Sequence, residues 1–169
     1  MHNLKKIPMG CIGNMGVISC LKGKDEFNKA CIAAPKLLGF ENSEQNEWPF
    51  FNQSWGAYLL YCLIVVPKEL YELDPEGDFY KELKSKNVMR HFEIHAESNS
   101  FSDKPDYHFR SMRNSVSHVN YSLDNSDLFE MWDHKPGQPN NRHWHVSIKH
   151  DDMQKFFVEL AECLVPYFK

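Results

Sequence analysis

Apolar side chains recur every three or four positions between residues 48 and 66, and this spacing constrains the fold more than any other feature. The positions are Trp48, Phe51, Trp55, Leu59, Cys62 and Val66. Such spacing places them on one face of an α-helix. Tyr58 and Tyr61 widen that face until the helix is apolar nearly all round. A helix of this kind lies at the centre of a bundle or is shared with a partner chain, so the pattern predicts a mainly α fold.

Three other segments repeat apolar residues at helical intervals, which predicts helices over residues 25–38, 78–97 and 151–165. The last begins with Asp151 and Asp152, whose negative charge a helix N-terminus favours. Its apolar face is formed by Met153, Phe156, Phe157, Leu160 and Leu164. We therefore expect an antiparallel helical bundle closed by this final helix.

Glycines interrupt the first part of the chain. The pattern Gly10-x-x-Gly13-x-x-Gly16 lacks the spacing of a dinucleotide-binding loop, and no strand–helix unit surrounds it. Glycine loses more conformational freedom on folding than any other residue. The segment therefore predicts an irregular lead-in over residues 1–23, without a phosphate-binding role.

Residues 127–148 predict a small C-terminal β-hairpin. Residues 127–133 and 142–148 favour strands, and the turn between them, residues 134–141, contains Pro136, Gly137 and Pro139. In the second strand, polar and apolar residues alternate. His143, His145 and Ser147 should share a polar face, opposite a packed face of Trp144, Val146 and Ile148.

Length and composition limit the class of protein. A chain of 169 residues with 42% hydrophobic and 25% charged residues fits one globular domain. The net charge of −4 provides no global attraction for nucleic acid, so RNA binding would need a local basic patch. Five scattered cysteines predict free thiols in a reducing compartment. The longest apolar segment is too short to span a membrane, and we expect a cytoplasmic protein.

The segment 109–119 carries the strongest candidate chemistry. It contains neither glycine nor proline, so a continuous helix is expected, with Asp106 as a possible cap. Asn114 and His118 then share a face, and Arg113 lies about 140° from His118 around the axis. An imidazole that titrates near neutrality, a planar cation and an amide are the groups that cleavage of a phosphodiester requires.

The Arg-Asn-x3-His sequence resembles the Arg-x(4–6)-His motif of the HEPN superfamily, in which a polar residue often follows the arginine. The motif helix is followed by a hairpin and a closing helix, and this order of elements resembles that of a plasmid-encoded HEPN subgroup. This resemblance implies an all-α bundle and, as in many HEPN proteins, a metal-independent endoribonuclease of the toxin or defence type.

The resemblance also implies roles for individual residues. His118 takes the proton from an RNA 2′-hydroxyl, Arg113 neutralises the charge that develops on the phosphoryl oxygens, and Asn114 orients the imidazole or phosphate. Arg110 and Ser117 are candidate substrate contacts. Because HEPN enzymes pair their motifs across a two-fold axis, we expect a homodimer. An RNA substrate and a possible cognate antitoxin are the expected partners, with no cofactor and no membrane.

Two alternatives remain. A HEPN-like module could bind nucleotide, RNA or a partner protein without cleaving, and the net acidity favours it. Histidine pairs could also bind Zn or Ni: His91-x3-His95 on a helix, or His143-x-His145 on a strand facing Asp133 and His134. Nine histidines in 169 residues pair by chance, and the first pair lacks the glutamate of metalloprotease motifs. We therefore expect no physiological metal.

Overall fold

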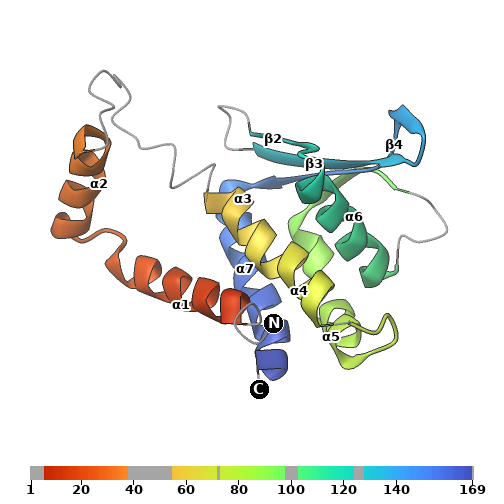
Figure 1. Cartoon of the computed structure of the whole chain (residues 1–169), viewed down its shortest axis with the longest axis horizontal. Coiled ribbons are helices and arrows are strands. Elements are labelled where there is room, and N and C mark those ends of the chain that lie inside the picture. Colours follow the sequence, from red (N-terminus) through yellow and green to blue (C-terminus); the bar gives the residue numbers. More distant parts are fainter. Residues whose placement is uncertain (1–5, 38–54, 72, 98–102, 124–127, 169) are drawn as a thin grey trace.

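The structure, a computed structural model, describes residues 6–37, 55–71, 73–97, 103–123 and 128–168 (Figure 1). The described chain is mostly helical and includes one antiparallel sheet. Its helices are α1 (Lys6–Leu21), α2 (Asp25–Leu37), α3 (Trp55–Leu60), α4 (Val66–Leu70), α5 (Asp78–Lys86), α6 (Pro105–Ser117) and α7 (His150–Leu164). Shorter helical segments are the π-helix η2 (Tyr61–Val65) and the 3₁₀-helices η3 (Val88–His91) and η4 (Val165–Phe168).

The sheet is larger than the predicted hairpin. Its strands are β1 (Glu93–Ala96), β2 (Tyr121–Leu123), β3 (Leu128–Lys135) and β4 (Gln138–Lys149), in the order β1-β4-β3-β2. β3 and β4 form the expected hairpin, but their turn is only two residues long, because the strands continue to Lys135 and resume at Gln138. Gly137 has φ +73°, a backbone conformation that glycine adopts without strain.

The single helix predicted over residues 78–97 is wrong beyond Lys86. Asn87 adopts a left-handed conformation with φ +48° and ends α5, a role that asparagine tolerates better than most residues. The chain then forms η3 and enters β1, which pairs with β4 from Glu93↔Ser147 onward. His91 and His95 therefore do not share a helical face.

The irregular lead-in predicted for residues 1–23 is wrong over residues 6–21, which form α1, and residues 1–5 lie outside the described residues. Cys11 of α1 is 1% exposed and belongs to the hydrophobic core. Packing against the core outweighs the helix-breaking tendency of the glycines, as tertiary contacts commonly do. The helix predicted over 25–38 is confirmed as α2.

The apolar segment that the sequence singled out forms α3, η2 and α4 in succession. Trp48 and Phe51 lie outside the described residues. Leu59 to Val66 are buried, apart from Tyr61, which is 52% exposed. The π-helical turn precedes Pro67, whose ring would collide with the carbonyl of Leu63 in a regular α-helix. The wider turn relieves that collision while keeping the segment buried.

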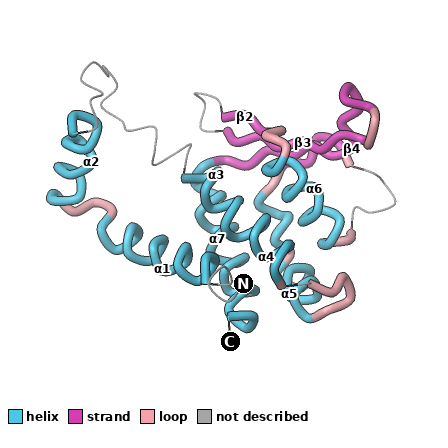
Figure 2. The backbone as a smooth tube through the Cα atoms, viewed as in Figure 1, coloured by secondary structure: helices cyan, strands magenta, loops and turns pink. Residues whose placement is uncertain are grey.

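The core lies between the inner face of the sheet and the helices α3 to α7, which occupy one side of the sheet in Figure 2. The sheet contributes Phe129, Met131, Trp144, Val146 and Ile148, each at most 2% exposed. α7 contributes the predicted face of Met153, Phe156, Phe157, Leu160 and Leu164, all buried. The antiparallel-bundle arrangement of the helices and the single-domain organisation remain predictions.

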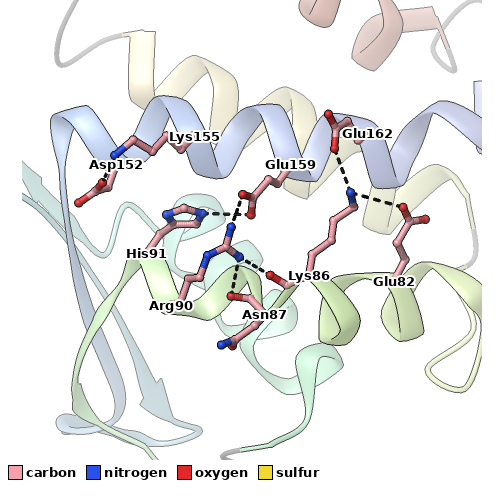
Figure 3. Close-up of polar contacts among 9 residues, drawn as sticks. All are labelled: Glu82, Lys86, Asn87, Arg90, His91, Asp152, Lys155, Glu159 and Glu162. Carbon is pink, nitrogen blue, oxygen red and sulfur yellow. Dashed lines mark hydrogen bonds and ion pairs between the residues drawn. The ribbon is translucent and has the colours of Figure 1, made fainter.

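Charged side chains hold α5 and η3 against α7 (Figure 3). Glu159 of α7 pairs with Arg90 and lies 3.0 Å from Nε2 of His91. Lys86 Nζ is 2.9 Å from Glu162 Oε2. Burial raises the pKa of Glu159, but hydrogen bonds from His91 and Arg90 outweigh it and leave this pKa below its usual value. These contacts hold α5 and η3 on α7, directly before β1 begins.

Within the described ranges, no helix has both the length and the apolar character that crossing a bilayer requires. Among the described cysteines, Cys11, Cys20, Cys62 and Cys163 are free thiols.

Candidate active site

The motif helix ends earlier than the sequence predicts. α6 stops at Ser117, His118 is its C-cap, and Val119 has φ +57°. The N–H of Asn120 donates to the Ser115 carbonyl (2.8 Å) and that of Val119 donates to the Val116 carbonyl (3.3 Å), the pair of bonds that defines a Schellman motif. The continuous helix expected to residue 119 is therefore wrong, and His118 sits where the chain turns away from the helix.

The start of α6 also differs from the expectation. Lys104 is the N-cap and Pro105 is the first helical residue, a position where its missing N–H costs nothing. Asp106 lies in the first turn instead of capping it.

Val119→Gly is expected to raise the free energy of unfolding by about 1 kcal/mol. The left-handed conformation strains a β-branched residue by roughly 1–2 kcal/mol, and the greater freedom of glycine in the unfolded chain cancels part of the gain. The midpoint of urea unfolding measures the effect. Val158→Gly, at a 46% exposed position within α7, is the control and should lower stability. A lower free energy of unfolding in both variants would contradict the inference that the backbone at Val119 is strained.

Two contacts fix the end of α6 on the sheet. The Ser115 hydroxyl donates to the Trp132 carbonyl (2.7 Å), and the Trp132 N–H donates to the Asn120 carbonyl (3.0 Å). Residues on both sides of His118 are therefore bound to β3. The imidazole of His118 therefore extends from a turn that hydrogen bonds hold against the sheet.

Arg113 is oriented by two neighbours. Its Nε donates to Oε1 of Glu69 on α4 (2.8 Å), and a terminal nitrogen lies 2.6 Å from the same oxygen. The other terminal nitrogen donates to Oδ1 of Asn114 (2.9 Å). The side chain of Arg113 is 33% exposed and that of Glu69 is 52% exposed, so the guanidinium remains accessible to solvent.

Asn114 extends this contact to the sheet. Its Nδ2 donates to Oδ2 of Asp133 on β3 (2.9 Å), and Asp133 is 7% exposed. The same oxygen lies 3.5 Å from Nε2 of His143 on β4. The Tyr107 hydroxyl of α6 lies 3.1 Å from Nδ1 of His143. A continuous polar network, which we call the Arg113–His143 network, therefore runs through Arg113, Asn114, Asp133, His143 and Tyr107.

A β-bulge brings His143 into that network. Asp133 pairs with Trp144 and His134 pairs with Arg142, so His143 has no partner in the register. The extra residue lets two successive side chains meet α6, which regular alternation forbids. Trp144 donates from Nε1 to Nδ1 of His108 (3.0 Å), and His143 contacts Tyr107. The prediction that His143 and His145 share one face is therefore wrong.

The remaining predicted site residues lie outside the network. His118 is exposed, and its side chain makes no hydrogen bond or ion pair with any described residue. Ser117 and Arg110 are exposed as well, and the Arg110 guanidinium lies 5.8 Å from the centre of the Tyr107 ring. The structure thus joins Arg113 and Asn114 directly, whereas His118 stands apart at the helix end.

Sequence reasoning missed Asp133, His143 and Tyr107 as neighbours of Arg113. Tyr107 and Arg113 are six residues apart on one helix, but nothing local indicates that a bulge turns His143 towards them. The only signal was the concentration of titratable residues at the far end of the hairpin. Hydrogen bonds join the guanidinium, the amide and the carboxylate in series, and the imidazole of His143 lies 3.5 Å from that carboxylate.

Comparison with known proteins identifies the family. Residues 19–169 match the family model described as HEPN pEK499 p136. No significant match was found among curated proteins, and none among solved structures. Because the match covers most of the chain, including α6 and the whole sheet, the protein belongs to this family of the HEPN superfamily.

Proposed function

We propose that the protein is a metal-independent endoribonuclease of the HEPN type, acting in the cytoplasm as a toxin or defence effector. HEPN family membership supports the class, since such domains are commonly ribonucleases. The observation that carries the proposal is the presence of an oriented, solvent-accessible Arg113 and an exposed His118 near the end of the same helix.

In the proposed reaction, His118 accepts the proton of an RNA 2′-hydroxyl. The 2′-oxygen bonds to the adjacent phosphorus while the bond from phosphorus to the 5′-oxygen breaks, and an acid protonates that leaving oxygen. The products are a 2′,3′-cyclic phosphate and a free 5′-hydroxyl. DNA lacks the attacking group and stays intact.

Arg113 stabilises the negative charge that builds on the phosphoryl oxygens, and stabilisation of this kind usually lowers the reaction barrier more than any other single effect. Its partner Glu69 is half-exposed, and ion pairs at the surface contribute about 0–1 kcal/mol. A phosphate can therefore replace Glu69 at the guanidinium at little cost. Asn114 retains its bond to Asp133 and holds the guanidinium in place.

The protonation of the leaving oxygen motivates a homodimer. One His118 cannot act as base and acid in the same step, so the proposal pairs it with the His118 of a second copy across a two-fold axis. Arg110 and Ser117 would contact outer phosphates from the same exposed surface. A cognate antitoxin would act by covering it.

A non-catalytic HEPN-like module is the second candidate. Arg113 is occupied by Glu69, and the chain has a net charge of −4, which disfavours a tight complex with RNA. In this reading, the Arg113–His143 network is a rigid surface for nucleotide, RNA or a partner protein.

Arg113→Ala is expected to lower the rate of RNA cleavage by about 100- to 1,000-fold, as loss of one transition-state donor does. The assay uses labelled RNA in EDTA and scores the cyclic phosphate product, with DNA of the same sequence alongside. Lys81→Ala, which removes an exposed cation of α5 that has no proposed role in binding or catalysis, is the control and should cleave as wild type. Equal activity in wild type and Arg113→Ala would overturn the proposal. An intact protein that binds RNA without cleaving it would favour the module.

A further inference from the structure

The outer face of the sheet carries a second cluster of functional groups. The helices α3 to α7 lie on the opposite face, so none of these helices covers this one (Figure 1). His95 of β1, Glu130 of β3 and His145 of β4 come from three adjacent strands, and a ligand atom of each lies within 4.8 Å of the others. The Arg113–His143 network uses none of these residues.

Sheet register explains the cluster. Glu130 and Glu93 both pair with Ser147, and Trp132 pairs with His145, so these side chains share the outer face. The irregularity between Ile94 and Ala96 lets His95 approach His145, with ring centres 4.7 Å apart. Neither histidine pair suggested by the sequence is involved as such, since His91 binds Glu159 and His143 turns towards Tyr107.

We infer that His95, Glu130 and His145 form a binding site for a divalent transition metal of the Zn²⁺ class. Two imidazoles and one carboxylate are an established ligand set for such ions, and three protein ligands leave a fourth position open. His145 Nε2 lies 3.9 Å from Glu130 Oε2. Ligands around a tetrahedral Zn²⁺ are roughly 3.3 Å apart, so small side-chain rotations close the site.

An unpaired donor atom points to the same conclusion. Nε2 of His145 is inaccessible to solvent and has no hydrogen-bond partner within the described chain. A buried polar atom without a partner costs free energy, and coordination to a metal would satisfy it.

The other two ligands are positioned by neighbours. Nε2 of His95 lies 2.8 Å from the Ser147 hydroxyl, and its Nδ1 lies 4.0 Å from Glu93 Oε1. Whichever nitrogen binds the metal, the other retains a polar neighbour, as metal-bound histidines generally do. The Ser122 hydroxyl donates to Glu130 Oε2 (3.3 Å), which orients the carboxylate.

Titration calorimetry of the full-length protein with Zn²⁺, and Co²⁺ absorption spectra, test the site. Wild type should bind one ion per chain, whereas Mg²⁺ should not compete, because imidazole ligands disfavour it. His145→Ala should weaken binding by at least about 100-fold, exceeding the effect of losing an outer-shell group. Glu130→Gln preserves shape and should also weaken binding. His134→Ala, which removes another β3–β4 hairpin histidine, is the control and should bind as wild type.

Two outcomes would overturn the inference. One is Zn²⁺ binding that is unchanged in folded His145→Ala and Glu130→Gln, and the other is equal weakening by His134→Ala. The measurement is independent of RNA cleavage, since Arg113→Ala should bind Zn²⁺ as tightly as wild type. Failure of the nuclease proposal therefore leaves this test intact.

Discussion

His118→Ala is expected to lower the rate of RNA cleavage by about 100- to 10,000-fold, the usual contribution of a positioned general base. The substitution leaves the fold unchanged, because the imidazole is exposed and makes no contact that holds α6 to β3. Those contacts use Ser115, Asn120 and Trp132. The rate constant of single-turnover cleavage in EDTA measures the loss without interference from product release.

Two controls make the result specific. His150→Ala removes a histidine at the start of α7 and should cleave as wild type. Added imidazole should restore part of the activity of His118→Ala, because a soluble base can enter the space of the lost side chain. Unchanged cleavage in His118→Ala, with loss in His143→Gln, would assign the base to the Arg113–His143 network and contradict the role of His118.

Trp144→Ala is expected to lower the free energy of unfolding by about 3–5 kcal/mol, the range for a large aromatic residue in a core. Trp144 is 0% exposed on the inner face of β4. Its removal leaves a cavity and deprives Nδ1 of His108, a residue that is only 2% exposed, of its indole donor. Urea unfolding followed by circular dichroism gives the change in free energy.

Trp132→Ala is the matched control, because Trp132 lies on the neighbouring strand but faces outward. Its ring is half-buried and is covered by the Arg142 guanidinium at 4.3 Å. The free energy of unfolding should fall by only about 1 kcal/mol, mainly because that cation–π contact is lost. Equal losses in the two variants would contradict the placement of the core on the inner face.

Local sequence patterns predicted the elements whose stabilising residues are close together in the chain. The apolar stripe of α7 repeats every three or four residues, and all five of its predicted core residues are buried. Alternation along β4 likewise identified Trp144, Val146 and Ile148 as core positions. In both cases, the period of the pattern is that of the element itself.

Elements that depend on distant partners were predicted poorly. Residues 93–96 have a helical pattern but form β1, because the edge of β4 offers backbone hydrogen bonds and Asn87 ends α5 first. Residues 6–21 contain glycines but form α1, because Cys11 packs into the core. A local stretch of sequence contains neither the edge of β4 nor the core residues against which Cys11 packs.

The sequence likewise predicted some residues of the candidate site and missed others. A short stretch of the chain contains the motif residues Arg113, Asn114 and His118, and it also carries the resemblance to the HEPN family. The residues that surround the motif are determined by the register of the sheet strands. A bulge of one residue carries His143 to Asp133 and Tyr107, and the irregularity in β1 brings His95 to His145. Strand register is established by packing across the whole core, so only the folded molecule reveals it.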